Sequence, residues 1–104
     1  MIVKGKNGLV MLLYRADRKV SWNKMRKIAE IKKGRMCTEE EVKALGVLPG
    51  AVPPFSALLG VKGVVDTRFK EQKMMAFNAG LKEKSIVMKT EDFSFKGMTE
   101  ADIT

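Results

Sequence analysis

The sequence predicts an α+β fold in one domain, residues 1–104, in which a mixed and partly barrel-like β-sheet carries short helices. Apolar runs of strand length occur in both halves of the chain, whereas apolar residues at helical spacing occur in short stretches of the first half. All three prolines lie between these helical stretches and a β-rich second half. A length of 104 residues, 45% of them hydrophobic, is typical of one globular domain.

The chain opens on a predicted β-hairpin. Met1–Val3 has the character of a strand, and Asn7-Gly8 is a dipeptide that favours a tight hairpin turn. Leu9–Tyr14 is an almost continuous apolar run, which predicts a strand that is buried on both faces.

A helix is predicted after Ser21, a favourable N-cap residue. Trp22, Met25, Ile28 and Ala29 recur at helical spacing and would face the core. Basic side chains gather on and after this helix, either as a solvated face or as a contact surface for the phosphates of a nucleic acid. The candidate phosphate contacts are Lys24, Lys27, Lys32, Lys33 and Arg35.

A second helix, residues 39–45, is predicted from a capping box in which Thr38 is the N-cap and Glu41 the third helical residue. Capping and the helix dipole explain the three acidic residues of its first turn, so we do not assign them to catalysis. Gly46 is a normal residue at which to end the helix. Cys37, just before the cap, is interpreted as a small packing residue.

The stretch Gly46–Phe55 holds all three prolines and two glycines. Proline fixes φ and removes a backbone donor, whereas glycine permits a positive φ and a close approach of a ligand to the backbone. Such a loop either turns the chain and does no more, or presents its remaining N–H groups as a cradle for an oxygen atom. Loop chemistry alone leaves both interpretations open.

The second half is predicted to complete a sheet of about five or six strands. The expected elements are a strand at 61–65 ended by Asp66, a polar turn or short helix at 67–72, strands at 73–77 and 85–89, and a capped turn at 90–93. Asn78-Ala79-Gly80 is a tight turn that exposes backbone. The polar tail, 94–104, either carries one last strand or frays.

Composition narrows the chemistry. The chain has no histidine and one cysteine, which excludes imidazole bases, a disulfide within the chain and histidine- or thiolate-ligated metal sites, and we expect no metal and no cofactor. Neither a membrane-spanning apolar run nor a signal region is visible, so we expect a cytoplasmic protein without a membrane partner. The net charge of +8 favours a polyanionic partner such as a nucleic acid.

The order of several motifs resembles the YbaK/ProX family of aminoacyl-tRNA deacylases, which are related to the editing domain of bacterial prolyl-tRNA synthetase. The resemblance runs from about residue 1 to residue 93. It is carried by the capping-box helix, Pro49-Gly50-Ala51-Val52-Pro53-Pro54-Phe55, Val64-Val65-Asp66, Phe77-Asn78-Ala79-Gly80, Ser85-Ile86-Val87-Met88 and Thr90-Glu91-Asp92-Phe93.

This resemblance implies a trans-acting deacylase that hydrolyses the ester of a small mis-attached amino acid at the 3′ end of tRNA, with tRNA-Pro as the expected carrier. The implied catalytic residues are Gly50, Ala51 and Val52, whose N–H groups would hold the aminoacyl carbonyl, together with Asp66 in the pocket and Lys4. The implied substrate-binding residues are Pro53, Pro54, Phe55, Asn78, Ala79 and Gly80. The basic side chains would hold the 3′ phosphates.

The chain departs from the family pattern at its N-terminal part, which is short, and at Ser56, where a glycine is common. The family lysine of the first strand falls just before Met1 in the favoured register, so Lys4 is its candidate replacement. Two other hypotheses are a non-catalytic module that binds tRNA or a synthetase, and an interaction domain with no nucleic-acid role. A second copy of the chain is a candidate partner at the sheet edge.

Overall fold

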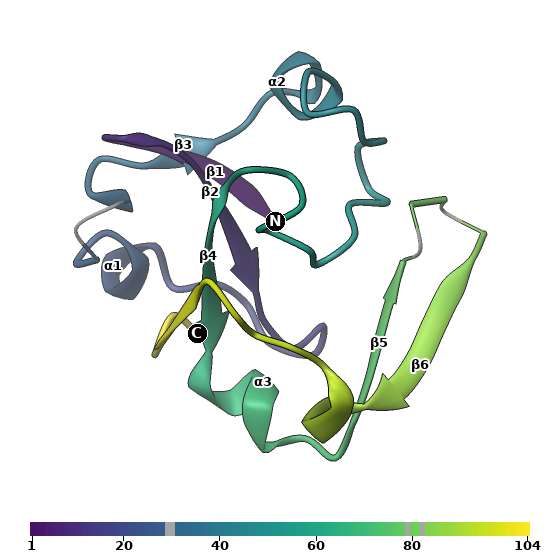
Figure 1. Ribbon diagram of the computed structural model, residues 1–104. Helices are drawn as coiled ribbons and strands as arrows, with labels where there is room; N and C mark the ends of the chain where they lie inside the picture. The colour runs from purple at the N-terminus through teal and green to yellow at the C-terminus, as the bar shows by residue number, and fades with distance from the viewer. Residues whose placement is uncertain (29–30, 79, 82) are drawn as a thin grey trace.

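The computed structural model describes residues 1–28, 31–78, 80–81 and 83–104 (Figure 1). In chain order its elements are β1 Ile2–Gly5, β2 Gly8–Leu13, α1 Trp22–Met25, β3 Arg35–Met36, α2 Glu39–Lys43, β4 Lys62–Asp66, α3 Thr67–Glu71, β5 Met74–Asn78, β6 Ser85–Lys89, the 3-10 helix η2 Thr90–Asp92 and β7 Met98–Ala101.

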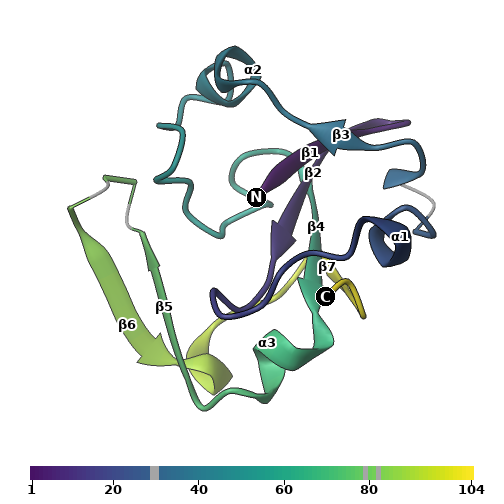
Figure 2. The same ribbon diagram turned by 180° about the vertical axis from the view of Figure 1, so that it is seen from behind.

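Five strands form one mixed sheet in the order β3-β1-β2-β4-β7. β1 is antiparallel to β2 and β3, whereas β2 is parallel to β4 and β4 is parallel to β7. β5 and β6 form a separate antiparallel hairpin that stands beside this sheet, as both views show (Figures 1 and 2). The predicted α+β class and mixed sheet are confirmed, and in the described part of the chain the sheet stays open rather than closing into a barrel.

The predicted N-terminal hairpin is confirmed. Gly5 pairs with Gly8, so the loop between β1 and β2 consists of the two residues Lys6 and Asn7. Gly8 has a φ of 121°, a value that favours glycine over any residue with a side chain.

The helices begin where the sequence predicts and end earlier. The Ser21 hydroxyl accepts the Lys24 N–H at 3.3 Å at the start of α1, and Thr38 and Glu41 form both hydrogen bonds of the capping box at the start of α2. α1 ends at Met25, although Ile28 still packs against the core. The expected position of Ala29 on this helix lies outside the described residues.

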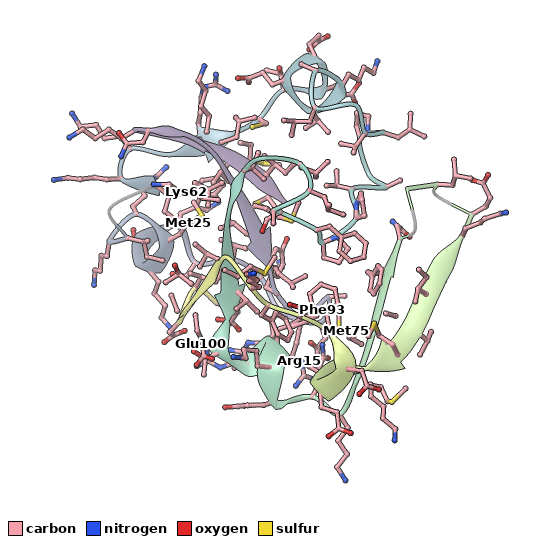
Figure 3. All side chains as sticks on the ribbon, in the orientation of Figure 1. Arg15, Met25, Lys62, Met75, Phe93 and Glu100 are labelled. Atoms are coloured by element: carbon pink, nitrogen blue, oxygen red, sulfur yellow. The ribbon has the colours of Figure 1, made fainter. Side chains whose placement is uncertain are left out.

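Two apolar cores cover the two faces of the large sheet, because successive side chains of a strand point to opposite faces. On the face of α1, the buried cluster consists of Val3, Val10, Leu12, Met25, Ile31, Val64 and Ile103. On the face of the β5–β6 hairpin, it consists of Val65, Phe69, Met75 and Phe93. Figure 3 shows Met25 on the first side and Met75 and Phe93 on the second.

The C-terminal tail carries the last strand, β7, which resolves the two alternatives that the sequence left open. Beyond β7, Ile103 is fully buried in the α1-side core, and its carbonyl accepts the Ser21 N–H at 2.7 Å. The helices in the described part of the chain are too short to cross a membrane.

Candidate functional site

The Pro/Gly stretch forms a defined turn at Leu48–Ala51. The Ala51 N–H donates to the Leu48 carbonyl at 3.0 Å, and Gly50 has a φ of 81°. Proline at the second position and a glycine with positive φ at the third are the signature of a type II turn. This geometry uses the N–H of Ala51, which is fully buried, and leaves the N–H of Gly50 out of the turn.

Asn78 connects this turn to the β5–β6 hairpin. Its side-chain amide donates to the Gly50 carbonyl at 3.0 Å, across 28 residues of sequence. Asn78 is the last residue of β5 and is half-buried, so the strand end fixes where its amide lies. The two sequence motifs therefore meet in space.

Gly50 and Asn78 lie on the wall of one cavity of about 370 Å³, a volume in the usual range of small-ligand sites. The remaining wall residues come from the start of the chain, the end of β2, β3, α2 and the Pro/Gly stretch: Met1, Ile2, Tyr14, Met36, Cys37, Glu39, Val42, Pro49 and Val52. Within the described residues, the backbone N–H groups of Gly50 and Val52 have no backbone acceptor. A backbone N–H group without a partner can donate a hydrogen bond to an oxygen atom of a ligand.

The phenylalanines Phe55, Phe77 and Phe93 pack against one another in a cluster. Phe55 stacks on Phe93 at 5.7 Å between ring centroids and meets the Phe77 ring edge-on at 5.6 Å. Pro54 and Phe55 line a different groove, of about 440 Å³, with Ser94 and neighbouring residues. Of the predicted substrate-binding residues, Pro54 and Phe55 thus line this second groove and not the Gly50 cavity.

The rest of that predicted set is placed as follows. Pro53 is half-buried in the same loop. Gly80 has a φ of 90° in the turn after β5. Ala79 lies outside the described residues.

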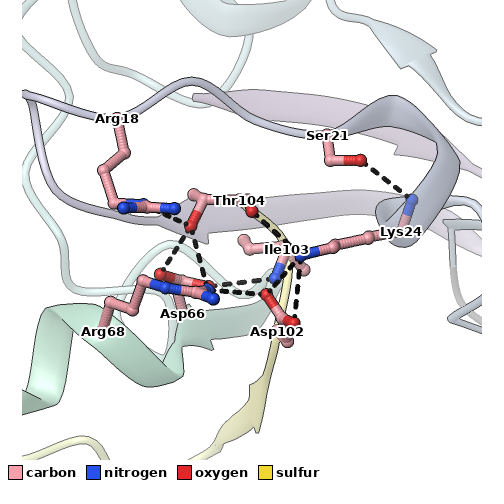
Figure 4. Close-up of polar contacts among 8 residues, drawn as sticks. All are labelled: Arg18, Ser21, Lys24, Asp66, Arg68, Asp102, Ile103 and Thr104. Carbon is pink, nitrogen blue, oxygen red and sulfur yellow. Dashed lines mark hydrogen bonds and ion pairs between the residues drawn. The ribbon is translucent and has the colours of Figure 1, made fainter.

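Asp66 lies on the α1-side face of the sheet. It ends β4 two residues after Val64, which belongs to the α1-side core. Its fully buried carboxylate accepts the Ile103 N–H at 2.9 Å and the Thr104 hydroxyl at 3.0 Å (Figure 4). The structure does not bring Asp66 to the wall of the Gly50 cavity.

Lys4 is exposed, and its ammonium lies 3.6 Å from the Glu41 carboxylate. Arg35 reaches the same carboxylate at 2.8 Å, and these contacts with the Thr38 N–H lower the pKa of Glu41 from 4.5 to about 2, the Arg35 hydrogen bond being the largest cause. Burial raises the pKa of the neighbouring Cys37 thiol. No group of three His, Cys, Asp or Glu residues suited to a metal ion occurs in the described ranges.

The predicted phosphate contacts do not form one free surface. Lys24 pairs with Asp102 at 3.1 Å, and Arg35 pairs with Glu41. Lys27, Lys32 and Lys33 are exposed in the segments that follow α1. In Figures 1 and 2, α1 lies across the large sheet from the β5–β6 hairpin, so these lysines are remote from Asn78 along the fold.

Several cavity walls were not predicted from the sequence. Tyr14, Met36 and the α2 residues Glu39 and Val42 come from three different segments, and none carries a local motif that marks it as a wall residue. Capping and the helix dipole explain Glu39 at the level of the sequence, and neither predicts that it lines a cavity. The available signal was proximity in sequence, since Glu39 and Val42 belong to the helix that leads into the Pro/Gly loop.

The model of the aminoacyl-tRNA editing domain family matches residues 1–95. The chain belongs to this family. The match confirms the resemblance given by the motif order and includes the Gly50 turn and Asn78.

Two curated relatives carry the same name, multifunctional Ser/Thr-tRNA deacylase ProXp-y, one from Escherichia coli strain K12 and one from Escherichia coli O157:H7. Each is 32% identical over 91 residues, which is 86% of this chain and 54% of the relative. The chain thus spans about half the length of these relatives.

Two solved structures share the fold. A putative signal transduction protein from Marinobacter aquaeolei VT8 superposes with a TM-score of 0.79 at 20% identity, over 98% of this chain and 23% of that one. The hypothetical protein APE2540 superposes with a TM-score of 0.81 at 22% identity, over 99% of this chain and 70% of that one.

Proposed function

We propose that this domain is an aminoacyl-tRNA deacylase, which acts in trans and hydrolyses the ester between a small amino acid and the 3′ end of tRNA. The observation that carries the proposal is the turn at Pro49-Gly50. It lies on the wall of a cavity and leaves backbone N–H groups uncommitted, in a chain that belongs to the editing-domain family. The names of the curated relatives support the same class of reaction.

In the proposed reaction, water attacks the ester carbonyl of the aminoacyl group. Negative charge then develops on the carbonyl oxygen, and the N–H groups of Gly50 and Val52 stabilise it as hydrogen-bond donors. The bond between the carbonyl carbon and the ribose oxygen breaks, which yields the free amino acid and a tRNA with a free terminal hydroxyl. The chain has no histidine, so we assign the positioning of water to the neighbouring ribose hydroxyl of the substrate.

Asn78 acts through the turn. Its amide holds the Gly50 carbonyl at 3.0 Å and thereby fixes the orientation of the adjoining peptide groups. The net charge of +8 attracts the phosphates of the tRNA, and Lys27, Lys32 and Lys33 are the exposed candidates for this contact. Lys24 and Arg35 would first have to leave their acidic partners.

A deacylation time course tests the proposal. Two sets of substrates are compared: tRNA-Pro carrying alanine or cysteine, and tRNAs carrying serine or threonine. We expect the protein to accelerate loss of the amino acid from at least one of them. Gly50→Ala should slow the reaction about 100-fold, because a side chain at this φ distorts the turn and displaces its donors. Asn78→Ala should slow it about tenfold, because the Gly50 carbonyl loses its partner.

Matched controls separate the site from general strain. Gly60 also has a positive φ, 69°, with open space where a Cβ would lie, so Gly60→Ala adds comparable strain outside the cavity. Asn23→Ala removes an exposed asparagine from α1. Both should hydrolyse at the wild-type rate. Salt-sensitive binding of tRNA without any hydrolysis would replace the proposal with a non-catalytic binding module.

A further inference from the structure

One charged side chain stands on the cavity wall, counted over the described residues, and it is an acid. Glu39, the first residue of α2, lines the cavity together with Gly50 and Asn78. The other wall side chains are apolar or uncharged. A carboxylate here is unexpected for a protein of net charge +8 whose proposed ligand is a polyanion, because it repels phosphate.

The two neighbouring acids of the same helical turn are placed differently from Glu39. Glu41 closes the capping box and receives Arg35 and Lys4. Glu40 is exposed, as Glu39 is, but it is not part of the cavity wall. Glu39 has no ion-pair partner among the described residues, so its carboxylate remains available to a ligand.

We propose that Glu39 binds the α-ammonium group of the aminoacyl ester, an inference that rests on the deacylase function proposed above. An aminoacyl-tRNA carries one cationic group next to its ester, since the ammonium nitrogen is bonded to the carbon that bears the carbonyl. If that carbonyl lies against the N–H groups of Gly50 and Val52, the ammonium enters the same cavity. A carboxylate on the wall satisfies it with a charge-assisted hydrogen bond.

This assignment gives the site two complementary ends. Backbone donors at Gly50 meet the carbonyl oxygen, and the acceptor at Glu39 meets the ammonium. A ligand that carries the free amine then binds more tightly, so the site prefers aminoacyl esters over acyl esters of the same size. Because Glu39 is exposed to solvent, the preference should be about three- to tenfold rather than absolute.

The test uses two non-hydrolysable probes, 3′-deoxy-3′-(L-alanylamido)adenosine and its L-lactylamido counterpart, in which a hydroxyl replaces the ammonium. Dissociation constants are measured by NMR titration at pH 6.5, where the amine is cationic. The wild-type protein should bind the alanyl probe about three- to tenfold more tightly. Glu39→Gln should abolish this difference, and the matched control Glu40→Gln, one residue along the same helix, should preserve it.

Equal affinities of the wild-type protein for the two probes, or a difference that survives in Glu39→Gln, would overturn the assignment. So would a failure of the wild-type protein to bind either probe. The deacylation time course separates this inference from the proposed function. Hydrolysis that depends on Gly50 but not on the ammonium leaves the deacylase intact and removes Glu39 from recognition, whereas absence of both hydrolysis and probe binding removes both.

Discussion

The side chain of Ser56 occupies the space next to Gly63 that a Cβ at residue 63 would need. Ser56 is buried directly against β4, and a Cβ built on Gly63 would lie 2.7 Å from the Ser56 hydroxyl oxygen and 3.1 Å from its Cβ. The same Cβ would lie 2.7 Å from Cγ of Met98 on β7. The serine that follows Pro-Pro-Phe, where the resemblance leads one to expect glycine, therefore fits because the facing strand residue has no side chain.

Gly63→Ala should lower the free energy of unfolding by about 1–3 kcal/mol, because it overpacks a buried contact. In a Ser56→Gly background the cost should be smaller, since part of the crowding is removed, and Met98 accounts for the remainder. Urea denaturation of the four proteins of this double-mutant cycle gives the coupling. An equal cost in both backgrounds would show that Ser56 and Gly63 do not share the contact.

At the same scale, the Pro/Gly loop shows how much of a local structure can be predicted from its residue types. The pair Pro49-Gly50 predicts a turn with a positive φ at the glycine, and the structure has it. The N–H groups of Gly50, Ala51 and Val52 are expected to act together. The Ala51 N–H, however, donates to the Leu48 carbonyl within the turn, so only the other two lack a backbone acceptor among the described residues. Which donors remain free depends on hydrogen-bond geometry, and a list of residue types does not contain it.

At the scale of elements, α2 combines two roles in one turn. Thr38 and Glu41 satisfy the first backbone donors of the helix, and Glu39 faces the cavity. The helix has no buried residue of its own, so its end contacts rather than its packing hold it in place. Its placement therefore depends on the protonation state of Glu41.

Acid should loosen α2 in a defined pH window. The pKa of Glu41 is lowered from 4.5 to about 2 in the folded protein, so its carboxylate stabilises the fold fully above about pH 4.5. That contribution is lost progressively as the pH falls from 4.5 towards 2. Hydrogen exchange at the amides of α2 should accelerate over this range in the wild-type protein. In Glu41→Gln, which has no charge to lose, the same change should be absent, and an identical acid response would contradict the assignment.

The elements themselves were largely predictable, whereas their pairing was not. The hairpin of β1 and β2, both N-caps and the strands β4, β5 and β6 follow from local patterns. The parallel pairs β2–β4 and β4–β7 join segments separated by long crossovers, and no short-range signal selects them. The cavity is equally hard to predict, since its wall residues come from β1, β3, α2, the Pro/Gly stretch and the end of β5, which lie far apart in the sequence.

At the scale of the whole molecule, two polar groups of residues occupy different places. The cavity wall holds the Gly50 turn, Asn78 and Glu39. On the α1 side, Asp66 holds the C-terminal residues, and Lys24 and Arg68 both pair with Asp102 (Figure 4). These contacts with Asp66, Lys24 and Arg68 hold the C-terminal residues against the core that contains Ile103.

Substitutions of Asp66 test its contacts with the C-terminal residues separately from the cavity. Asp66→Ala leaves the Ile103 N–H and the Thr104 hydroxyl without their buried acceptor and should lower the free energy of unfolding by about 2–4 kcal/mol. Asp66→Asn keeps an oxygen for the Ile103 N–H, while its amide group can donate to the Thr104 oxygen, so this variant should stay folded. The control Asp92→Ala removes an exposed acid from η2 and should leave the free energy of unfolding unchanged.

The pocket role that the family resemblance implies for Asp66 predicts a different result from its observed hydrogen bonds. If Asp66 acts by anchoring the C-terminal residues, deacylation by folded Asp66→Asn should stay within about twofold of the wild-type rate, because Asp66 does not line the cavity. If it acts on the substrate, the rate should fall by about 100-fold with little change in stability. Circular dichroism and urea denaturation establish the folded fraction, and the deacylation rate per folded molecule then decides between the two roles.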